Sequence, residues 1–243
     1  MVELKLRNEF EKVLRDYQPS PEVYEILRQI PLVIMLGVTG AGKNTIINHL
    51  LGSGQYHFVV SDTTRPPKLR DDKMEEDGVQ YHFRRERDVL DDLKNGLFLE
   101  AELIHNQQVS GTSVRELMKA ADSGKIPVNE IDFGGTINVR HAKPDTIFFF
   151  VIPPSFREWK YRLQGREIMS EDELKNRLET AVKVLDEGLS RNDFIFVVNE
   201  SSHESAEEID AYVHERTVMA DQNAARDLAR QIRHDLTNYL STH

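Results

Sequence analysis

Apolar residues gather along the chain in short continuous runs that are separated by longer segments with helical spacing. These runs predict buried strands at residues 32–36, 57–60, 146–152 and 194–198, and residues 126–131 form a fifth, weaker candidate. The run at 146–152 is continuous rather than alternating, which is typical of a parallel strand covered on both faces.

Amphipathic segments fill the intervals between these runs. Their spacing predicts helices at residues 43–51, 86–95, 113–123, 156–164 and 170–189. Strands that alternate with helices imply an α/β fold with an open, mostly parallel five-stranded sheet flanked by helices. In such a sheet the ligand crevice lies at the carboxyl ends of the strands.

The two ends of the chain are charged and helix-prone. Residues 3–29 predict two helices packed outside the core, with a break near Pro19-Ser20-Pro21. Residues 203–242 predict further helix, including an amphipathic segment with apolar residues at i, i+4 spacing: Ala224, Leu228, Ile232, Leu236 and Leu240. We expect this stripe to dock on the protein's own core, with a dimer contact as the alternative, so the chain is a monomer or a homodimer.

Residues 37–43, Gly-Val-Thr-Gly-Ala-Gly-Lys, fit the spacing G-x-x-x-x-G-K between a predicted strand and a predicted helix. In that context backbone N–H groups and the helix N-terminus cradle a nucleotide phosphate. We expect Lys43 to be exposed at this glycine loop and to bridge the outer phosphates. The predicted cradle consists of Gly37, Thr39, Gly40, Ala41, Gly42, Lys43, Asn44 and Thr45.

Asn44 stands where this pattern has a serine or threonine whose hydroxyl usually reaches Mg²⁺. An amide oxygen can also ligate Mg²⁺, directly or through water. We favour the simpler interpretation that nucleotide phosphates and water hold the ion, with no dedicated metal site in the protein.

Composition narrows the class of protein. A chain of 243 residues is one large domain or one core with inserted lobes, and its net charge of −10 argues against a nucleic-acid partner. There is no cysteine, which agrees with a reducing compartment. The N-terminus lacks an apolar signal core and no 18-residue apolar run occurs, so we expect a soluble cytoplasmic protein without a membrane partner.

Five ordered blocks beyond the glycine loop resemble guanylate kinases, over roughly residues 31–200. The blocks are Ser61-Asp62-Thr63-Thr64-Arg65, residues 77–83 with Tyr81, Phe98-Leu99-Glu100, Glu130-Ile131-Asp132, and residues 152–155 followed by the arginines at 162, 166 and 177. The resemblance implies that Ser61, Arg65 and Tyr81 hold the acceptor phosphate and that Glu100 and Asp132 read the guanine edge.

The same resemblance implies a lid and an ATP site. Arg166 and Arg177 would surround the migrating phosphoryl together with Lys43, and Asn199 would line the ATP base. The residue types agree with this function, because phosphoryl transfer needs positioning and positive charge more than covalent chemistry. Arg162 is expected to be a surface charge and Trp159 a packing residue.

The departures from the family fall in the acceptor lobe. Lys68 replaces a second phosphate-binding arginine, and Arg70 in a lengthened loop is a candidate substitute. The chain has Val109-Ser110-Gly111-Thr112 where the family typically has Tyr-Tyr-Gly-[ST], so a phosphate-binding tyrosine is missing and Thr112 is retained. Ser110 and Thr112 are included among the expected acceptor contacts.

The resemblance implies a P-loop NTPase fold with three parts. These are an N-terminal helical extension at 1–30, a guanylate-kinase-like domain at 31–200 and a C-terminal helical segment at 201–243; the domain carries an inserted monophosphate-binding lobe at about 60–112 and a lid at about 156–185. The implied function is transfer of the γ-phosphoryl of ATP, with Mg²⁺, to GMP or dGMP. Two alternatives stay open: a kinase of another phosphorylated acceptor such as a ribose bisphosphate, and a non-catalytic protein-binding module.

Overall fold

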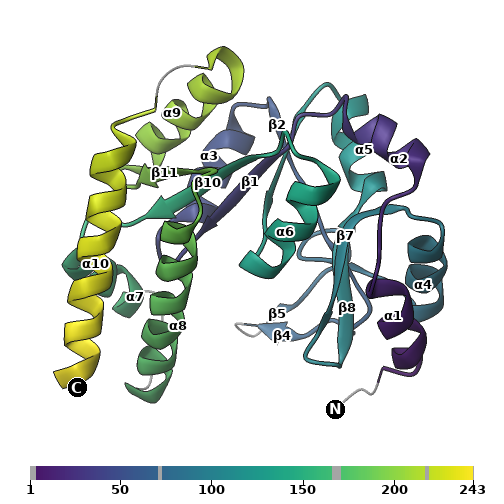
Figure 1. Cartoon of the computed structure of the whole chain (residues 1–243), viewed down its shortest axis with the longest axis horizontal. Helices are drawn as coiled ribbons and strands as arrows, with labels where there is room; N and C mark the ends of the chain where they lie inside the picture. Colours follow the sequence, from purple (N-terminus) through teal and green to yellow (C-terminus); the bar gives the residue numbers. More distant parts are fainter. Residues whose placement is uncertain (1–3, 71–72, 166–170, 217–218, 243) are drawn as a thin grey trace. The chain divides into compact units, whose positions relative to one another are not determined.

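The apolar runs of the sequence form parallel strands in the computed structural model (Figure 1). Strands β1 (Val33–Gly37), β10 (Ile147–Ile152) and β11 (Phe194–Val198) pair in parallel in the order β11-β10-β1. Strands β2 (Tyr56–Phe58) and β9 (Ile126–Glu130) pair in parallel with each other. These parallel strands and their flanking helices confirm the predicted α/β class.

The structure describes residues 4–70, 73–165, 171–216 and 219–242. The chain divides into two compact units. The first unit comprises the N-terminal segment up to Leu32 and residues 56–146, and the second comprises residues 33–55 and the chain from Ile147 onward.

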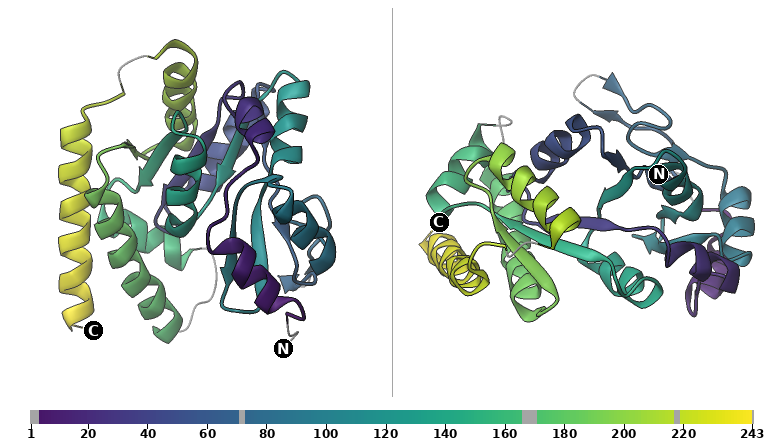
Figure 2. Two further views of the ribbon diagram at one scale, coloured as in Figure 1. Left: turned by 45° about the vertical axis from the view of Figure 1, so that its right-hand side comes forward. Right: turned by 90° about the horizontal axis from the view of Figure 1, so that it is seen from above.

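The second unit carries the glycine loop on a fully buried sheet. All six residues of β10 are buried, as the continuous apolar run predicts. The helices of this unit are α3 (Lys43–Gly52), α7 (Phe156–Gln164), α8 (Glu171–Ser190), α9 (Ser202–Glu215) and α10 (Gln222–Thr242). Helix α9 packs on α3, and α10 runs beside α8 (Figure 2).

Helix α10 docks on its own unit through a stripe that differs from the predicted one. The buried residues are Ala225, Ala229, Ile232 and Leu236, whereas Ala224 is exposed and Leu228 and Leu240 are half-buried. The reason is geometric: at 3.6 residues per turn, a strict i, i+4 series drifts around the helix, and alternating steps of four and three keep one face. The prediction that this helix packs on its own core is confirmed.

The first unit is built around short strands. A four-stranded sheet has the order β6-β3-β8-β7, and a two-stranded hairpin lies in the lengthened loop. The strands of this sheet and hairpin are β3 (Asp62–Thr63), β4 (Leu69–Arg70), β5 (Lys73–Met74), β6 (His82–Phe83), β7 (Phe98–Ile104) and β8 (Gln108–Ser113). The unit also contains β2 and β9, and its helices are α1 (Arg7–Leu14), α2 (Pro21–Leu27), α4 (Glu86–Lys94), α5 (Val114–Asp122) and α6 (Phe133–Ala142).

Helix α6 and the short strands of this unit were not predicted. Two-residue strands are too short to show a period of two, and α6 begins with Gly134-Gly135 among its first residues, which lowers helix propensity. Asp132 nevertheless caps α6, its Oδ1 accepting a hydrogen bond from Gly135 N at 3.4 Å.

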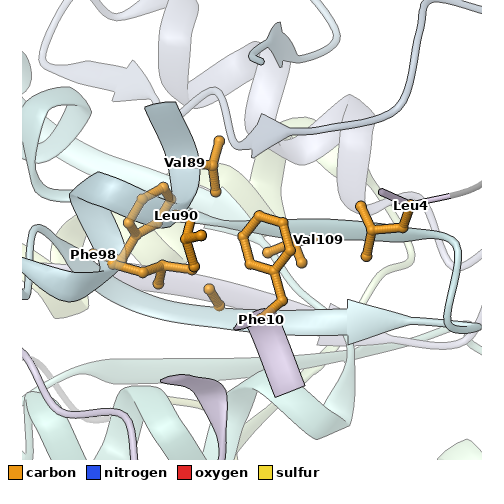
Figure 3. Packing of buried hydrophobic residues seen from close by; sticks show 8 residues of the cluster. Leu4, Phe10, Val89, Leu90, Phe98 and Val109 are labelled. Carbon is orange, nitrogen blue, oxygen red and sulfur yellow. The ribbon is translucent and has the colours of Figure 1, made fainter. Parts of the chain in front are cut away.

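The break between the N-terminal helices occurs as predicted: Ser20 caps α2 and Pro21 occupies its first turn. The expectation that these helices lie outside the core is wrong, because α1 buries Phe10 and α2 buries Val23 and Leu27. Phe10 is completely buried in an apolar cluster of the first unit with Leu90 of α4 and Phe98 of β7 (Figure 3). The apolar faces of α1 and α4 form this part of the core together with residues of β7 and β8.

Within the described residues, every helix is either too short or too polar to cross a lipid bilayer.

Candidate functional site

The glycine loop of the second unit has the backbone conformation that its glycines allow. Gly42 caps α3 with φ 97°, in the left-handed region that non-glycine residues rarely adopt. A Cβ at this position would lie 2.1 Å from the side-chain nitrogen of Asn199, and a Cβ at Gly37 would lie 2.1 Å from Val151 O. Both positions therefore require glycine for space as well as for conformation.

Two buried side chains hold the carbonyl groups of this loop. The indole nitrogen of Trp159 donates to Thr39 O at 2.8 Å, and the amide nitrogen of Asn199 donates to Ala41 O at 2.7 Å. Each of these two residues is 1 % exposed. These hydrogen bonds fix the loop's conformation in the absence of a ligand. Trp159 therefore supports the loop as well as packing in the core, and Asn199 binds the loop backbone directly.

Lys43 is buried rather than exposed, which corrects the expectation from the sequence. Its residue exposure is 8 %, and Nζ donates to Gly37 O at 2.8 Å and Val38 O at 3.1 Å. The physical reason is that an ammonium group is too costly to bury without acceptors, and the loop's own carbonyls supply them. The lysine thus stabilises the loop that it serves.

Asn44 and Thr45 are exposed in the first turn of α3, next to the loop. The described residues contain no group of three His, Asp or Glu side chains placed to hold a metal ion. Asn44 offers an amide oxygen and Thr45 a hydroxyl next to the loop, groups that can approach a Mg²⁺ ion or its waters.

A pocket of about 360 Å³ lies beside the glycine loop within the second unit. The loop contributes Gly37 and Thr39, and helix α8 contributes Arg177 and Asn176 among others. Nη2 of Arg177 contacts Glu173 Oε1 at 2.7 Å, one helical turn away. Arg177 thus lies where a cation can face a loop-bound phosphate, whereas Arg166 lies outside the described residues. Arg162 donates to Asn199 O and to Glu158.

Glu100 occupies a buried position in the sheet of the first unit. The residue is 7 % exposed, and its Oε1 accepts a hydrogen bond from Thr112 N at 3.0 Å. Burial, with Glu102 and Asp132 nearby, raises the pKa of Glu100 from 4.5 to about 7, against the opposing effect of Thr112. A buried carboxylate with few protein donors is suited to a ligand that brings its own N–H groups.

Two further carboxylates lie near Glu100, around the N-terminal turn of α6. Asp132 caps that helix and is exposed, and Glu102 lies against Gly134, where a Cβ would come within 2.7 Å of its Oε1. Burial and the charge of Asp132 raise the pKa of Glu102. The first unit therefore gathers acceptor groups at one place, as the resemblance implies for Glu100 and Asp132.

Arg65 is buried and tied to Glu75, a residue of the lengthened loop. Its Nη2 donates to Glu75 Oε1 at 3.0 Å, its Nη1 donates to Oε2, and its guanidinium lies 4.8 Å from the Tyr81 ring centroid. Oε2 of Glu75 also accepts from Lys68 N at 2.9 Å. The hydrogen bonds to Glu75 raise the pKa of Arg65. The structure thus brings Arg65 and Tyr81 together. The sequence did not predict Glu75 as a partner of Arg65; the one available clue was that it is an acidic residue ten positions after the arginine.

The remaining predicted acceptor contacts are spread over the same unit. Lys68 is exposed, and the side chain of Arg70 lies outside the described positions. Ser110 donates to Thr63 Oγ1 at 2.8 Å across the β3–β8 pair. Ser61 is half-buried and its carbonyl accepts from His82 N at 2.9 Å. Ser110 is therefore engaged within the sheet.

Comparison with known proteins assigns this architecture to a family. A family model described as guanylate kinase matches residues 29–216. The chain belongs to the guanylate kinase family. Guanylate kinase 1 of Arabidopsis thaliana is 37 % identical over 164 residues, 67 % of this chain and 41 % of the plant protein. Guanylate kinase of Sulfurimonas denitrificans is 31 % identical over 201 residues, 82 % of this chain and 94 % of that protein.

The crystal structure of guanylate kinase from Anaplasma phagocytophilum has the same fold, with a TM-score of 0.54 and 22 % sequence identity over 79 % of this chain and 88 % of that one. The chain spans about two fifths of the length of the two plant relatives that it matches. Helix α1 lies N-terminal to the residues that the family model matches.

Proposed function

We propose that this protein is an ATP-dependent guanylate kinase that transfers the γ-phosphoryl of ATP to GMP or dGMP. The observation that carries the choice of base is the buried carboxylate of Glu100. Guanine presents donors at N1–H and N2–H₂, which match carboxylate acceptors, whereas adenine presents an acceptor at N1. Leaving such groups unpaired costs ~1–3 kcal/mol each, enough for tenfold discrimination or more.

The donor half of the reaction rests on the glycine loop. Its backbone N–H groups and the N-terminus of α3 are suited to the ATP phosphates, and Lys43 can exchange its two carbonyl partners for phosphate oxygens. Arg177 lies in the pocket beside Gly37 and Thr39 and is the lid arginine that we propose for the migrating phosphoryl group. Arg166 remains a proposed partner on the strength of the resemblance.

The acceptor half needs positioning rather than a general base, because the attacking group is a phosphate oxygen that is already anionic. Arg65 can present its Nε edge to that phosphate while Glu75 holds the opposite edge. Tyr81, next to the guanidinium, is the other proposed phosphate contact. Ser61, Lys68, Arg70, Ser110, Thr112 and Asp132 complete the proposed acceptor site.

Mg²⁺ bound to the ATP phosphates would supply charge neutralisation and in-line orientation. Asn44 and Thr45 are the exposed residues of the first turn of α3 that lie closest in sequence to the loop and can approach that ion or its waters. The cysteine-free sequence suits a reducing compartment, so we propose the cytoplasm as the place of action.

Two other functions are less well supported. Replacement of an arginine by Lys68 favours a different phosphorylated acceptor such as a ribose bisphosphate. A sugar phosphate, however, has no base N–H groups for the buried carboxylate of Glu100 to accept. A non-catalytic binding module has no need for a loop whose lysine and carbonyls are held as they are here.

A coupled assay of ADP release tests the proposal. GMP, dGMP, AMP, UMP, CMP and ribose 1,5-bisphosphate are compared at equal concentration with saturating Mg-ATP. We expect GMP and dGMP to exceed the other acceptors at least tenfold in kcat/KM. Equal rates with AMP and GMP would refute guanine selection, and turnover of the bisphosphate alone would establish the other kinase.

A further inference from the structure

The hydroxyl group of Tyr17 makes two hydrogen bonds to one residue of strand β7. It donates to Phe98 O at 2.8 Å and accepts from Phe98 N at 2.8 Å. Tyr17 lies between α1 and α2, N-terminal to residues 29–216 of the family match. A side chain that pairs with both backbone groups of one residue does locally what a neighbouring strand would do.

Strand β7 is the outermost strand in the order β6-β3-β8-β7, so among the described residues no strand pairs with one side of its backbone. Phe98 is completely buried, so water cannot readily hydrogen-bond its backbone N–H and C=O groups, and leaving them unpaired would cost free energy. Burial raises the pKa of Tyr17 well above its ordinary value, so the phenol keeps its proton and remains both donor and acceptor.

The anchored residue lies two positions before Glu100, at an irregularity in the sheet. The β7–β8 register shifts between Phe98 and Glu100, and Glu100 pairs with Thr112. On the near side of the shift, Val114 N donates to Leu97 O at 3.0 Å. An irregular register leaves the direction of the following side chains dependent on local anchors. The hydroxyl of Tyr17 is such an anchor for the backbone that aims Glu100 at Thr112 N.

The segment that carries Tyr17 is fastened to the first unit along its length; we call residues 4–20 the N-terminal strap. Near its start, the Glu86 carboxylate accepts from Leu6 N at 2.8 Å. In its middle, Phe10 is completely buried in the cluster shown in Figure 3. At its end, Ser20 N donates to Gly96 O at 3.1 Å, and a Cβ at Gly96 would lie 2.4 Å from that nitrogen.

We propose that Tyr17 is a positioning residue for base selection: through Phe98 it fixes the part of β7 that aims Glu100 at the guanine edge. This inference rests on the proposed function, since it concerns the same acceptor site. It gives the N-terminal strap a role in specificity, and it assigns that role to the hydroxyl rather than to the aromatic ring.

The test is Tyr17→Phe, which removes one oxygen atom and keeps the ring. We expect KM for GMP to rise about tenfold and the GMP-over-AMP ratio of kcat/KM to fall about tenfold, with KM for ATP within twofold of the parent. Tyr24→Phe is the matched control, because it removes the hydroxyl that bonds Gln18 Oε1 in the same segment. It should leave all of these values unchanged.

Phe10→Leu separates positioning from general loosening of the unit, since it weakens the same cluster and keeps the hydroxyl. At an equal loss of melting temperature, Phe10→Leu should leave the GMP-over-AMP ratio near the parent value. The positioning role is overturned if Phe10→Leu lowers that ratio as much as Tyr17→Phe does, or if Tyr17→Phe leaves it unchanged.

Hydrogen exchange of the parent protein tests the anchor without any substitution. The amide of Phe98 should exchange as slowly as amides between β7 and β8, and fast exchange would contradict the anchor. A parent enzyme that does not phosphorylate GMP refutes the proposed function instead, whereas a GMP-specific parent with an indifferent Tyr17→Phe variant refutes this inference alone.

Discussion

The glycine loop of the second unit and the acceptor residues of the first unit are organised by different physical means. In the loop, the groups suited to a phosphate are backbone amides, and Trp159 and Asn199 fix the carbonyls behind them. In the first unit, the groups suited to a monophosphate are charged side chains that hold one another, as Glu75 holds Arg65. A phosphate site made of backbone amides keeps its geometry when nearby side chains are substituted. A network of side chains loses its geometry when one of its members is replaced.

This contrast explains where the sequence departs from its family. The loop keeps its glycines and lysine and departs from the usual pattern at Asn44, whereas the departures at Lys68, Ser110 and the lengthened loop lie in the first unit. Each acceptor contact is a separate side chain, so specificity and affinity can be adjusted there one residue at a time. Substitutions in the two regions should therefore affect different kinetic constants.

Replacement of the loop lysine should have the largest effect. In Lys43→Ala we expect kcat to fall ~10³-fold, because a cation that stabilises the migrating phosphoryl is lost. The bonds to Gly37 O and Val38 O are lost as well, so the free energy of unfolding should fall by ~1 kcal/mol in urea titrations. Lys183→Ala, an exposed lysine of the same unit, is the control. Turnover at the parent rate would show that the donor site is elsewhere.

Glu100→Gln should lower kcat/KM for GMP ~10²-fold, because the amide presents a donor to guanine donors and leaves groups unpaired. KM for ATP should stay within twofold. Glu102→Gln, a half-buried carboxylate on the same strand, should cost much less. An unchanged GMP-over-AMP ratio in Glu100→Gln would contradict base reading by this carboxylate.

The same variant should be more stable than the parent at high pH. The pKa of Glu100 is about 7 in the folded protein against 4.5 for an ordinary glutamate, so the folded state binds more protons between these values. The contribution of Glu100 to the parent's free energy of unfolding is therefore greatest below about pH 4.5 and decreases as the pH rises to 7. Above pH 7 we expect Glu100→Gln to gain ~2 kcal/mol, as measured by denaturant titration.

Glu75→Gln tests the side-chain network around Arg65. The substitution replaces the Glu75 oxygen that accepts from Arg65 Nη1 with an amide NH₂ group, which cannot accept. Arg65 therefore loses one of the hydrogen bonds that orient its guanidinium group. We expect KM for GMP to rise ~tenfold and the free energy of unfolding to fall by ~3 kcal/mol, since a buried pair is broken. Glu76→Gln, the exposed neighbour, should do neither. A lower KM for GMP would mean that Glu75 competes with the phosphate.

Asn44→Ser should have the smallest effect. It restores the hydroxyl that usually faces Mg²⁺, and we expect kcat to stay within ~threefold of the parent or to rise. Titration of Mg²⁺ at fixed ATP provides the measurement. A loss of tenfold or more would show that the amide of Asn44 has a specific role toward the ion.

The sequence was most informative where one local pattern decides the structure. The apolar run that became β10 and the glycine spacing at residues 37–43 each specify their element without help from distant residues. Helix α6 was missed because Gly134-Gly135 oppose helix formation locally, and the cap by Asp132 and packing on β7 override that preference.

The acceptor site shows the limit of such reasoning. Glu100 was predicted from its block, but its burial depends on Thr112 and on the pairing of strands β7 and β8, which the sequence pattern did not predict. The partners of Arg65 and Phe98, namely Glu75 and Tyr17, are separated from them by 10 and 81 residues. Pairs of this kind are set by tertiary packing, for which a periodic pattern carries no signal.

The most direct test of the contrast is to measure KM for ATP and KM for GMP in one coupled assay from pH 6 to pH 8. The pKa of Glu100 at about 7 makes the acceptor carboxylate progressively protonated below that pH, whereas the donor loop relies on backbone groups. We predict that KM for GMP falls ~tenfold from pH 6 to pH 8, that KM for ATP changes less than twofold, and that Glu100→Gln removes the GMP dependence. Two constants that move together, or a GMP dependence that survives in Glu100→Gln, would contradict the account.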